Sequence, residues 1–190
     1  MCIRDSSDRM FSVAMQKPDR QRESPCKVAG LGLIRVSVSH DDGTSHLILQ
    51  GLTRVEIVGT VQLKPYRIAA IRPLVAPQDE RVHIDALVAK IHELVEERVR
   101  IAPFPFPFSG IKNPAAEKKK NSQAGFSPQE VLQYLETIPD PEQLSDLVSC
   151  ALLPGAFERQ TILETVNIEQ RLRHLIHFLM AEIRRLQEGK

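Results

Sequence analysis

Histidines, cysteines and a lysine run are the side chains that suggest chemistry in this chain. His174 and His177 lie about one helical turn apart, as two ligands of a metal ion would. No further histidine, cysteine or carboxylate is spaced to complete such a site. We therefore interpret this pair, and also His83 and His92, as solvated residues of helix faces.

Catalysis that uses a bound nucleotide has no motif here. The phosphate loop G-x-x-x-x-G-K-[ST] is absent, and Gly30-Leu-Gly-Leu-Ile-Arg35 lacks the third glycine and the following helix of a dinucleotide fingerprint. No nucleophile and base form a candidate pair either. The sequence therefore predicts a protein that is not an enzyme and needs no cofactor.

Composition excludes further classes of function. The 25 basic and 24 acidic residues nearly cancel, so no overall field attracts nucleic acid, and Lys118–Lys120 reads as a solvated charge run. No apolar run approaches the ~20 residues of a membrane span. Cys2, Cys26 and Cys150 lie far apart without a CxxC pair, which indicates a reducing compartment, and we place the protein in the cytoplasm.

The stretch Val28–Leu74 predicts consecutive antiparallel strands separated by turns. β-branched residues fill the runs, and Asp41-Asp-Gly43 supplies a hairpin turn that tolerates positive φ. Residues Arg9–Gln16 alternate as a further strand would. Arg54 and Tyr66 are polar groups inside apolar runs, and we expect them to hydrogen-bond to neighbouring backbone, since buried polar groups need partners first.

A change of period after Gln78 marks a long amphipathic helix over Val82–Arg100. Such a helix must cover a sheet or pack in a bundle, and we expect it to cover the sheet. Residues 102–126 then break every pattern, because proline at every second position forbids a helix and favours an extended path. Two roles are open for three phenylalanines of this linker: packing between the domains, or offering an apolar surface to extended polypeptide. These candidate peptide-binding residues are Phe104, Phe106 and Phe108.

Three helix starts follow the linker, at Ser127, Asp140 and Asn167. Each is a short polar residue three positions before Glu or Gln, and two have proline at the first helical position. They predict a helical bundle over residues 127–190. One of its apolar faces is expected to contain Phe157, Ile162, Leu163 and Val166.

The strand region resembles the substrate-binding domain at the N-terminus of Lon proteases. In that family a Gly-x-Gly strand, a D-G hairpin, a G-x-x-R-x-x-I strand and a P-Y-x-x-A strand follow one another in this order. The matching residues here are Gly30, Gly32, Asp42, Gly43, Gly51, Arg54, Ile57, Pro65, Tyr66 and Ala69. The run ending in Arg171 and Leu172 also looks like the D-[VI]-x-x-R-L opening of the family's last helix.

The resemblance implies an α+β fold. Residues 7–101 would form a PUA-like antiparallel partial barrel with one covering helix, and residues 127–190 a C-terminal helical bundle. The implied function is non-catalytic binding of unfolded or exposed polypeptide, by a Lon-type recognition domain or adaptor without ATPase and protease modules. A protease or chaperone would be a further partner. The alternatives are RNA binding, through Lys118–Lys120 with Arg67 and Arg72, and a small-molecule site in the β domain.

The first six residues look like the translation of an adapter used in preparing sequencing libraries, and we interpret residues 1–6 as an artefact. The resembling domain begins with further strands, which carry an F-P-L-P type run and an E-x-R-Y type segment, and neither is present here. We therefore expect the sheet to lack its first strands. An open edge and a partly uncovered apolar face would follow, and both favour a homodimer.

Overall fold

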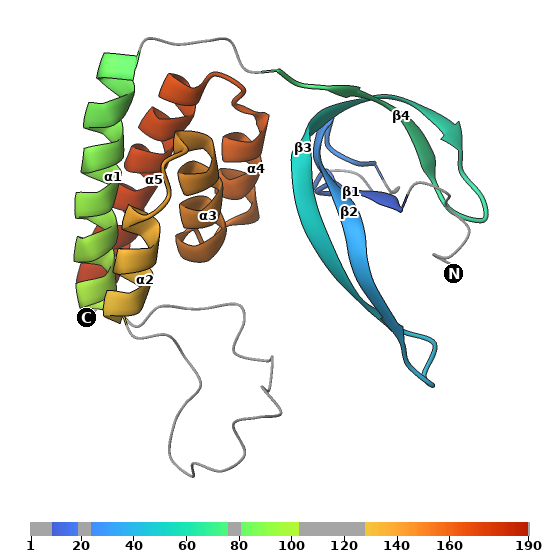
Figure 1. Cartoon of the computed structure of the whole chain (residues 1–190), viewed down its shortest axis with the longest axis horizontal. Coiled ribbons are helices and arrows are strands. Elements are labelled where there is room, and N and C mark those ends of the chain that lie inside the picture. Colours follow the sequence, from blue (N-terminus) through green and yellow to red (C-terminus); the bar gives the residue numbers. More distant parts are fainter. Residues whose placement is uncertain (1–8, 19–23, 76–80, 103–127, 190) are drawn as a thin grey trace. The chain divides into compact units, whose positions relative to one another are not determined.

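Four strands and five helices make up the described part of the chain, residues 9–18, 24–75, 81–102 and 128–189 (Figure 1). The chain divides into two units, Met1–Ala76 and Pro77–Lys190. All four strands belong to the first, here called the β unit, and all five helices to the second, the helical unit. The predicted α+β class is confirmed.

The β unit is one antiparallel sheet in the order β1-β2-β3-β4. Its strands are β1 (Met10–Val13), β2 (Val28–Ser39), β3 (Ser45–Gln62) and β4 (Ile68–Pro73). The first part of β3 pairs with β2 and the last part with β4, and the register shifts twice along each of these pairs. Such bulges bend a strand and increase its twist, and Figure 1 shows the strongly curved sheet that results.

The β2–β3 hairpin turns where the sequence predicts. Gly43 has φ +82° and donates its N–H to the carbonyl of His40 at 3.1 Å, while His40 donates to the carbonyl of Thr44 at 2.9 Å. This is a three-residue loop that closes with a glycine in the left-handed region. The Asp42 carboxylate accepts from the N–H and hydroxyl of Thr44, at 2.9 and 2.7 Å, and these bonds lower the pKa of Asp42, the hydroxyl bond most.

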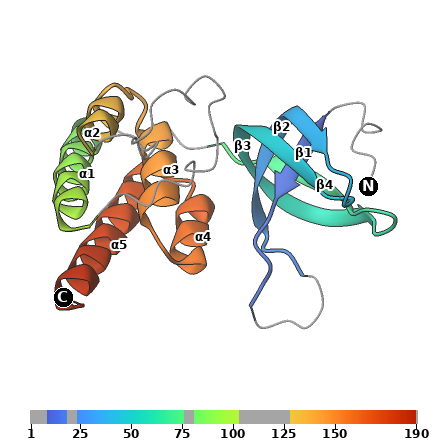
Figure 2. The same cartoon turned by 90° about the horizontal axis from the view of Figure 1, so that it is seen from below.

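The last helix of the helical unit packs against several of the others. The members of this unit are α1 (Arg81–Ile101), α2 (Pro128–Glu136), α3 (Pro141–Leu152), α4 (Ala156–Glu164) and α5 (Ile168–Glu188). α1 packs along α5 (Figure 2), and Ile91 and Val95 of α1 are buried in one core with Leu175 and Leu179 of α5.

This packing corrects the expected boundary between the domains. The helix predicted over 82–100 was assigned to the β domain as its cover, but α1 buries its apolar face inside the helical unit. The boundary therefore lies between Ala76 and Pro77 and not after residue 101. The period of a helix shows that one face is buried, but it does not name the partner that buries it.

Two of the three predicted helix starts are capped as expected. The Asp140 carboxylate accepts from the N–H of Glu142 at 3.0 Å, and the Asn167 side chain accepts from the N–H of Gln170 at 2.8 Å. Ser127 lies outside the described residues. Phe157 is exposed whereas Ile162 is buried, contrary to the face they were expected to share. Five residues correspond to about 140° around a helix of 3.6 residues per turn, so the two cannot face the same way.

Candidate functional site

The β unit leaves many large apolar side chains open to solvent. Among its described residues, the buried hydrophobic ones are Cys26, Ala29, Ile34 and Val55. The exposed large ones are Met10, Val13, Val36, Val38, Ile48, Leu52, Val58, Val61, Leu63, Ile68 and Val75. The described residues of the helical unit expose only Tyr134, Phe157 and Met180 in this class. Exposed apolar surface is therefore concentrated on the sheet.

One apolar cluster lies on the β2–β3 ribbon. Val36 pairs with Ile48, and Val38 pairs with His46. Cross-strand partners share a face of the sheet, so these side chains form one surface. The hairpin patch, defined as Val36, Val38 and Ile48, is 44%, 49% and 56% exposed.

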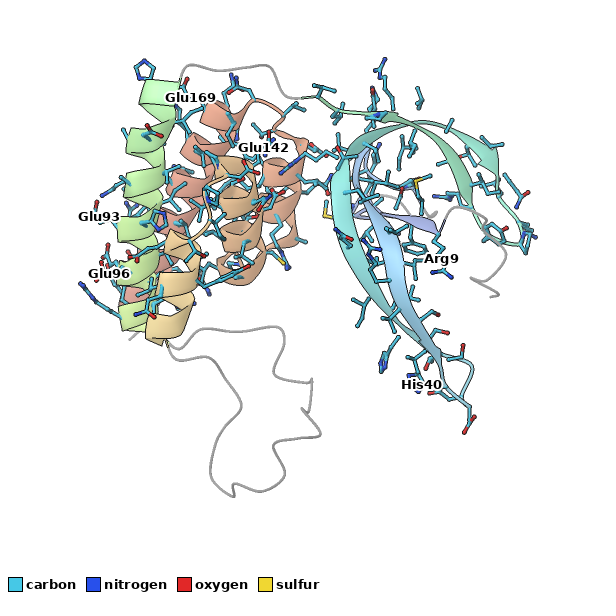
Figure 3. The ribbon with its side chains drawn as sticks, viewed as in Figure 1. Arg9, His40, Glu93, Glu96, Glu142 and Glu169 are labelled. Atoms are coloured by element: carbon cyan, nitrogen blue, oxygen red, sulfur yellow. The ribbon has the colours of Figure 1, made fainter. Side chains whose placement is uncertain are left out.

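Two histidines end this surface at the turn. His40 Nε2 lies 2.9 Å from His46 Nδ1, and the rings meet edge to face with centroids 4.5 Å apart. Figure 3 shows His40 at the far end of the ribbon. The hairpin patch is thus bounded by a polar pair at its tip.

A second apolar cluster lies at the other end of β3. Val58 and Val61 occupy the two positions where the β3–β4 register shifts, and both are exposed. A bulge leaves an extra residue without a cross-strand partner and re-aims its side chain. Leu63, the residue after β3, is also exposed, and we call these three residues, which lie close together in the sequence, the turn patch. It precedes the cis peptide bond between Lys64 and Pro65.

The glycines of the family signature shape the sheet. Gly32 pairs with Gly51 beside a register shift. A Cβ on Gly32 would lie 3.1 Å from the Gln50 carbonyl oxygen, closer than neighbouring atoms normally approach. Gly30 pairs with Arg54, which is buried.

The polar members of the signature are also placed within the sheet. The Arg54 carbonyl accepts from the N–H of Leu74 at 2.9 Å, which ties β3 to the end of β4. Tyr66 is half-buried in the β3–β4 turn, and its carbonyl accepts from Gln62 Nε2 at 3.4 Å. Both bonds are accepted by main-chain carbonyls, so the role expected for the side chains of Arg54 and Tyr66 stays a prediction.

Arg171 and Leu172, the remaining signature residues, lie in the core of the helical unit. Leu172 is fully buried, and Arg171 is 1% exposed. Arg171 donates to the carbonyls of Thr165 and Val166 at 2.7 and 2.9 Å, and to the Glu142 carboxylate at 3.3 Å. It therefore joins the α4–α5 turn to the start of α3. The signature residues are divided between the β unit and the helical unit.

One charged cluster of the β unit joins three of its segments. The Glu56 carboxylate lies 2.7 Å from the ammonium of Lys27 and also accepts from Arg72. These bonds lower the pKa of Glu56, the Lys27 bond most. Arg72, a candidate for an RNA-binding patch, is thus engaged by a carboxylate. The lysine candidates for that patch, Lys118–Lys120, lie outside the described residues.

Metal ligation finds no support within the described ranges, where no three His, Cys, Asp or Glu side chains are grouped as ligands. His174 is exposed, and its Nδ1 lies 3.2 Å from the Thr165 hydroxyl. None of the described helices is long and apolar enough to cross a membrane.

The phenylalanines Phe104, Phe106 and Phe108 and residues 1–6 also lie outside the described residues, so their expected roles stay predictions. Sequence reasoning missed the hairpin and turn patches. A signal was present, because Val36 and Val38 alternate with Ser37 and Ser39. That alternation predicts a strand with one apolar face, but it does not show whether anything covers the face.

A curved antiparallel sheet with a helical unit is also the fold of a solved Lon domain. The N-terminal domain of Mycobacterium avium complex Lon protease matches with a TM-score of 0.61 at 16% sequence identity, over 90% of this chain and 89% of that one. Residues 2–181 match the family model of the ATP-dependent protease La (LON) substrate-binding domain. The chain belongs to this family, as its strand signature indicated.

Relatives share the sequence at a modest level. The Lon protease of Dictyoglomus thermophilum is 22% identical over 185 residues, which cover 96% of this chain and 21% of the relative. Lon protease 1 of Hydrogenovibrio crunogenus is 29% identical over 142 residues, which cover 75% of this chain and 15% of the relative. The chain thus spans about a fifth or less of the length of these relatives.

Proposed function

We propose that this protein binds unfolded or extended polypeptide through its β unit and performs no chemistry on it. The observation that carries the proposal is the concentration of exposed apolar side chains on the sheet. Contiguous apolar surface on a domain marks sites of interaction. Membership of a family of substrate-binding domains supports the same function.

Recognition of this kind needs little sequence specificity. Valine, leucine and isoleucine side chains offer contact to any apolar segment, and folded proteins keep such segments buried. Unfolded chains are therefore the class of ligand that the surface selects. A protease or chaperone that acts on the bound polypeptide is the partner that we propose.

The binding proposal is tested by fluorescence anisotropy with a labelled, denatured protein. We expect micromolar affinity that changes little with salt. RNA binding that neutralised several phosphates would instead weaken about 10³-fold or more over a modest rise in salt. Tight, steeply salt-dependent binding of single-stranded RNA, without binding of denatured protein, would overturn the proposal.

A matched pair of variants tests whether the hairpin patch contributes. Val36→Thr with Ile48→Thr keeps β-branched side chains but replaces a methyl of Val36 and the ethyl of Ile48 by a hydroxyl, and we expect affinity to fall about fivefold or more. Met180→Gln is the control, since Met180 is 45% exposed, much as Val36 is, but lies in the helical unit. Equal losses in both variants would argue against a site on the sheet.

The non-catalytic part of the proposal has its own assay. The purified chain is expected neither to hydrolyse ATP nor to cleave casein. ATP turnover above a buffer control that is abolished by a substitution in this chain would contradict it.

A further inference from the structure

Among the described residues, the outer edge of β2 is paired over only part of its length. β1 pairs with β2 from Gly30 to Leu33, and the carbonyl of Arg9 accepts from the N–H of Ile34 at 2.9 Å. Beyond Ile34, no strand among the described residues pairs with the Arg35–Ser39 stretch on that side. Figure 1 shows the β2–β3 ribbon continuing past β1 toward the hairpin turn.

The hairpin turn determines which backbone groups point outward along this edge. His40 donates to the carbonyl of Thr44, so this pair is hydrogen-bonded. Bonded and non-bonded pairs alternate along an antiparallel ladder. Val38 with His46 and Val36 with Ile48 are therefore bonded pairs. Ser37 and Ser39 turn their N–H and C=O groups away from β3, toward the uncovered side.

This edge contains no proline, lysine or inward-pointing charge, which are among the usual protections against strand addition, and the bulge at Arg35 lies at its beginning. Its central residues are valine and serine. Arg35, the charged member of the stretch, donates from Nε to the Gln50 side chain at 2.7 Å, so it is held against β3. Within the part of the chain that the structure describes, no strand pairs with the serine positions of this edge.

We propose that an extended segment of unfolded polypeptide docks on the Arg35–Ser39 edge of β2 as an added strand. Main-chain bonds to Ser37 and Ser39 hold any backbone without reading its sequence, and alternate side chains of the segment contact the neighbouring hairpin patch. The ligand class is thus a proline-free segment in which apolar residues alternate. This inference rests on the proposed function and assigns its site.

The length of the edge favours such a segment over a second folded copy. Five residues of strand extend roughly 17 Å. A stable interface between folded proteins buries about 1,000 Å² or more, which so short an edge does not supply. An unfolded segment needs no matching second surface, because it can follow both the edge and the adjacent patch.

Proline substitution at outward positions tests the inference. Ser37→Pro and Ser39→Pro remove an N–H that points away from β3, so the ladder inside the sheet is kept, while the ring obstructs the edge. Ser37→Ala and Ser39→Ala are the controls because they keep the N–H. The probe is a labelled peptide in which valine and threonine alternate between terminal lysines. Circular dichroism confirms that each variant is folded.

We expect the proline variants to bind this peptide about tenfold more weakly, the factor that ~1.4 kcal/mol represents, and the alanine variants to bind it within about twofold of the unchanged protein. A second measurement is independent of protein folding. The same peptide, N-methylated at alternate residues along one edge, is expected to lose binding to the unchanged protein.

Three results would overturn the inference. If the proline variants and the N-methylated peptide both bind normally, the peptide binds elsewhere. The proposed function would still stand if the hairpin-patch variant lost affinity. A wild-type dimer in sedimentation that the prolines dissociate would assign the edge to a second copy. Peptide affinity that rises tenfold when residues 1–8 are removed would assign it to the chain's own N-terminal segment.

Discussion

The guanidinium of Arg98 on α1 lies 3.9 Å from the carboxylate of Glu182 on α5, and both side chains are only 6% exposed. Glu182 also accepts two bonds of 2.8 Å from Arg185, and Arg98 donates to the carbonyl of Ala102 at 3.2 Å. Burial lowers the pKa of Arg98, and the charge of Glu182 opposes this effect. A buried ion pair therefore joins the two longest helices.

Removing the carboxylate charge tests how much that pair stabilises the helical unit. Glu182→Gln leaves the Arg98 cation buried without its counter-charge, which we expect to lower the free energy of unfolding by about 2 kcal/mol in urea titrations followed by circular dichroism. Glu96→Gln is the control, because Glu96 pairs with Arg100 on the exposed face of α1, and it should cost below about 0.5 kcal/mol. Similar losses in both variants would show that the buried pair stabilises the protein no more than an exposed pair does.

Arg171 is expected to stabilise the turn between α4 and α5. Arg171→Met fills much of the same volume but leaves the carbonyls of Thr165 and Val166 without these donors, so we expect a loss of about 3 kcal/mol. Arg173→Met removes an exposed arginine that bonds to Glu169 one turn away, and it should change the unfolding free energy by less than about 0.5 kcal/mol. A thermal melt of Arg171→Met that coincides with the unchanged protein would contradict this role.

Glu56 should make the stability of the β unit depend on pH. Its pKa in the folded protein lies below the ordinary value of 4.5 because of Lys27 and then Arg72. Its stabilising contribution is therefore complete above about pH 4.5 and is lost as the pH falls through the lowered value. Glu56→Gln should reduce the urea midpoint at pH 7 and have less effect at pH 3. Lys27→Met should show the same pattern. A reduction of the urea midpoint that is equal at pH 7 and pH 3 would refute the role of the Glu56 charge.

The division into units predicts which fragments fold. Residues 77–190 retain α1, so we expect this fragment to melt cooperatively in circular dichroism. Residues 122–190 lack α1, which would expose the face of α5 that contains Leu175 and Leu179, and cooperative melting should be lost. A sharp melt of the shorter fragment would mean that α1 is dispensable to the helical core.

Local chemistry could be predicted from the sequence because it involves residues a few positions apart. The positive φ of Gly43 follows from the needs of a tight hairpin turn, and the caps at Asp140 and Asn167 follow from the unsatisfied N–H groups of a helix start. None of these requires knowledge of a distant segment. The same holds for the strand signature, because the order of its motifs along the chain indicated the family.

The partner that covers an apolar face could not be predicted from the sequence. Burial of α1 against α5 and exposure of Val36 and Ile48 were not predicted, although the period of each segment was recognised. An apolar stripe indicates that burying this face is favourable, but any matching surface can bury it.

The sequence by itself determined the strands, the turns, the helix starts and the family of this protein, since each depends on short-range geometry or on the order of motifs. Only the tertiary structure decided that α1 joins the helical unit and that, among the described residues, no strand pairs with the outer side of the Arg35–Ser39 edge and the hairpin patch is exposed. The reason is physical: hydrophobic burial is non-directional, so the choice of partner depends on which surfaces the folded chain brings together.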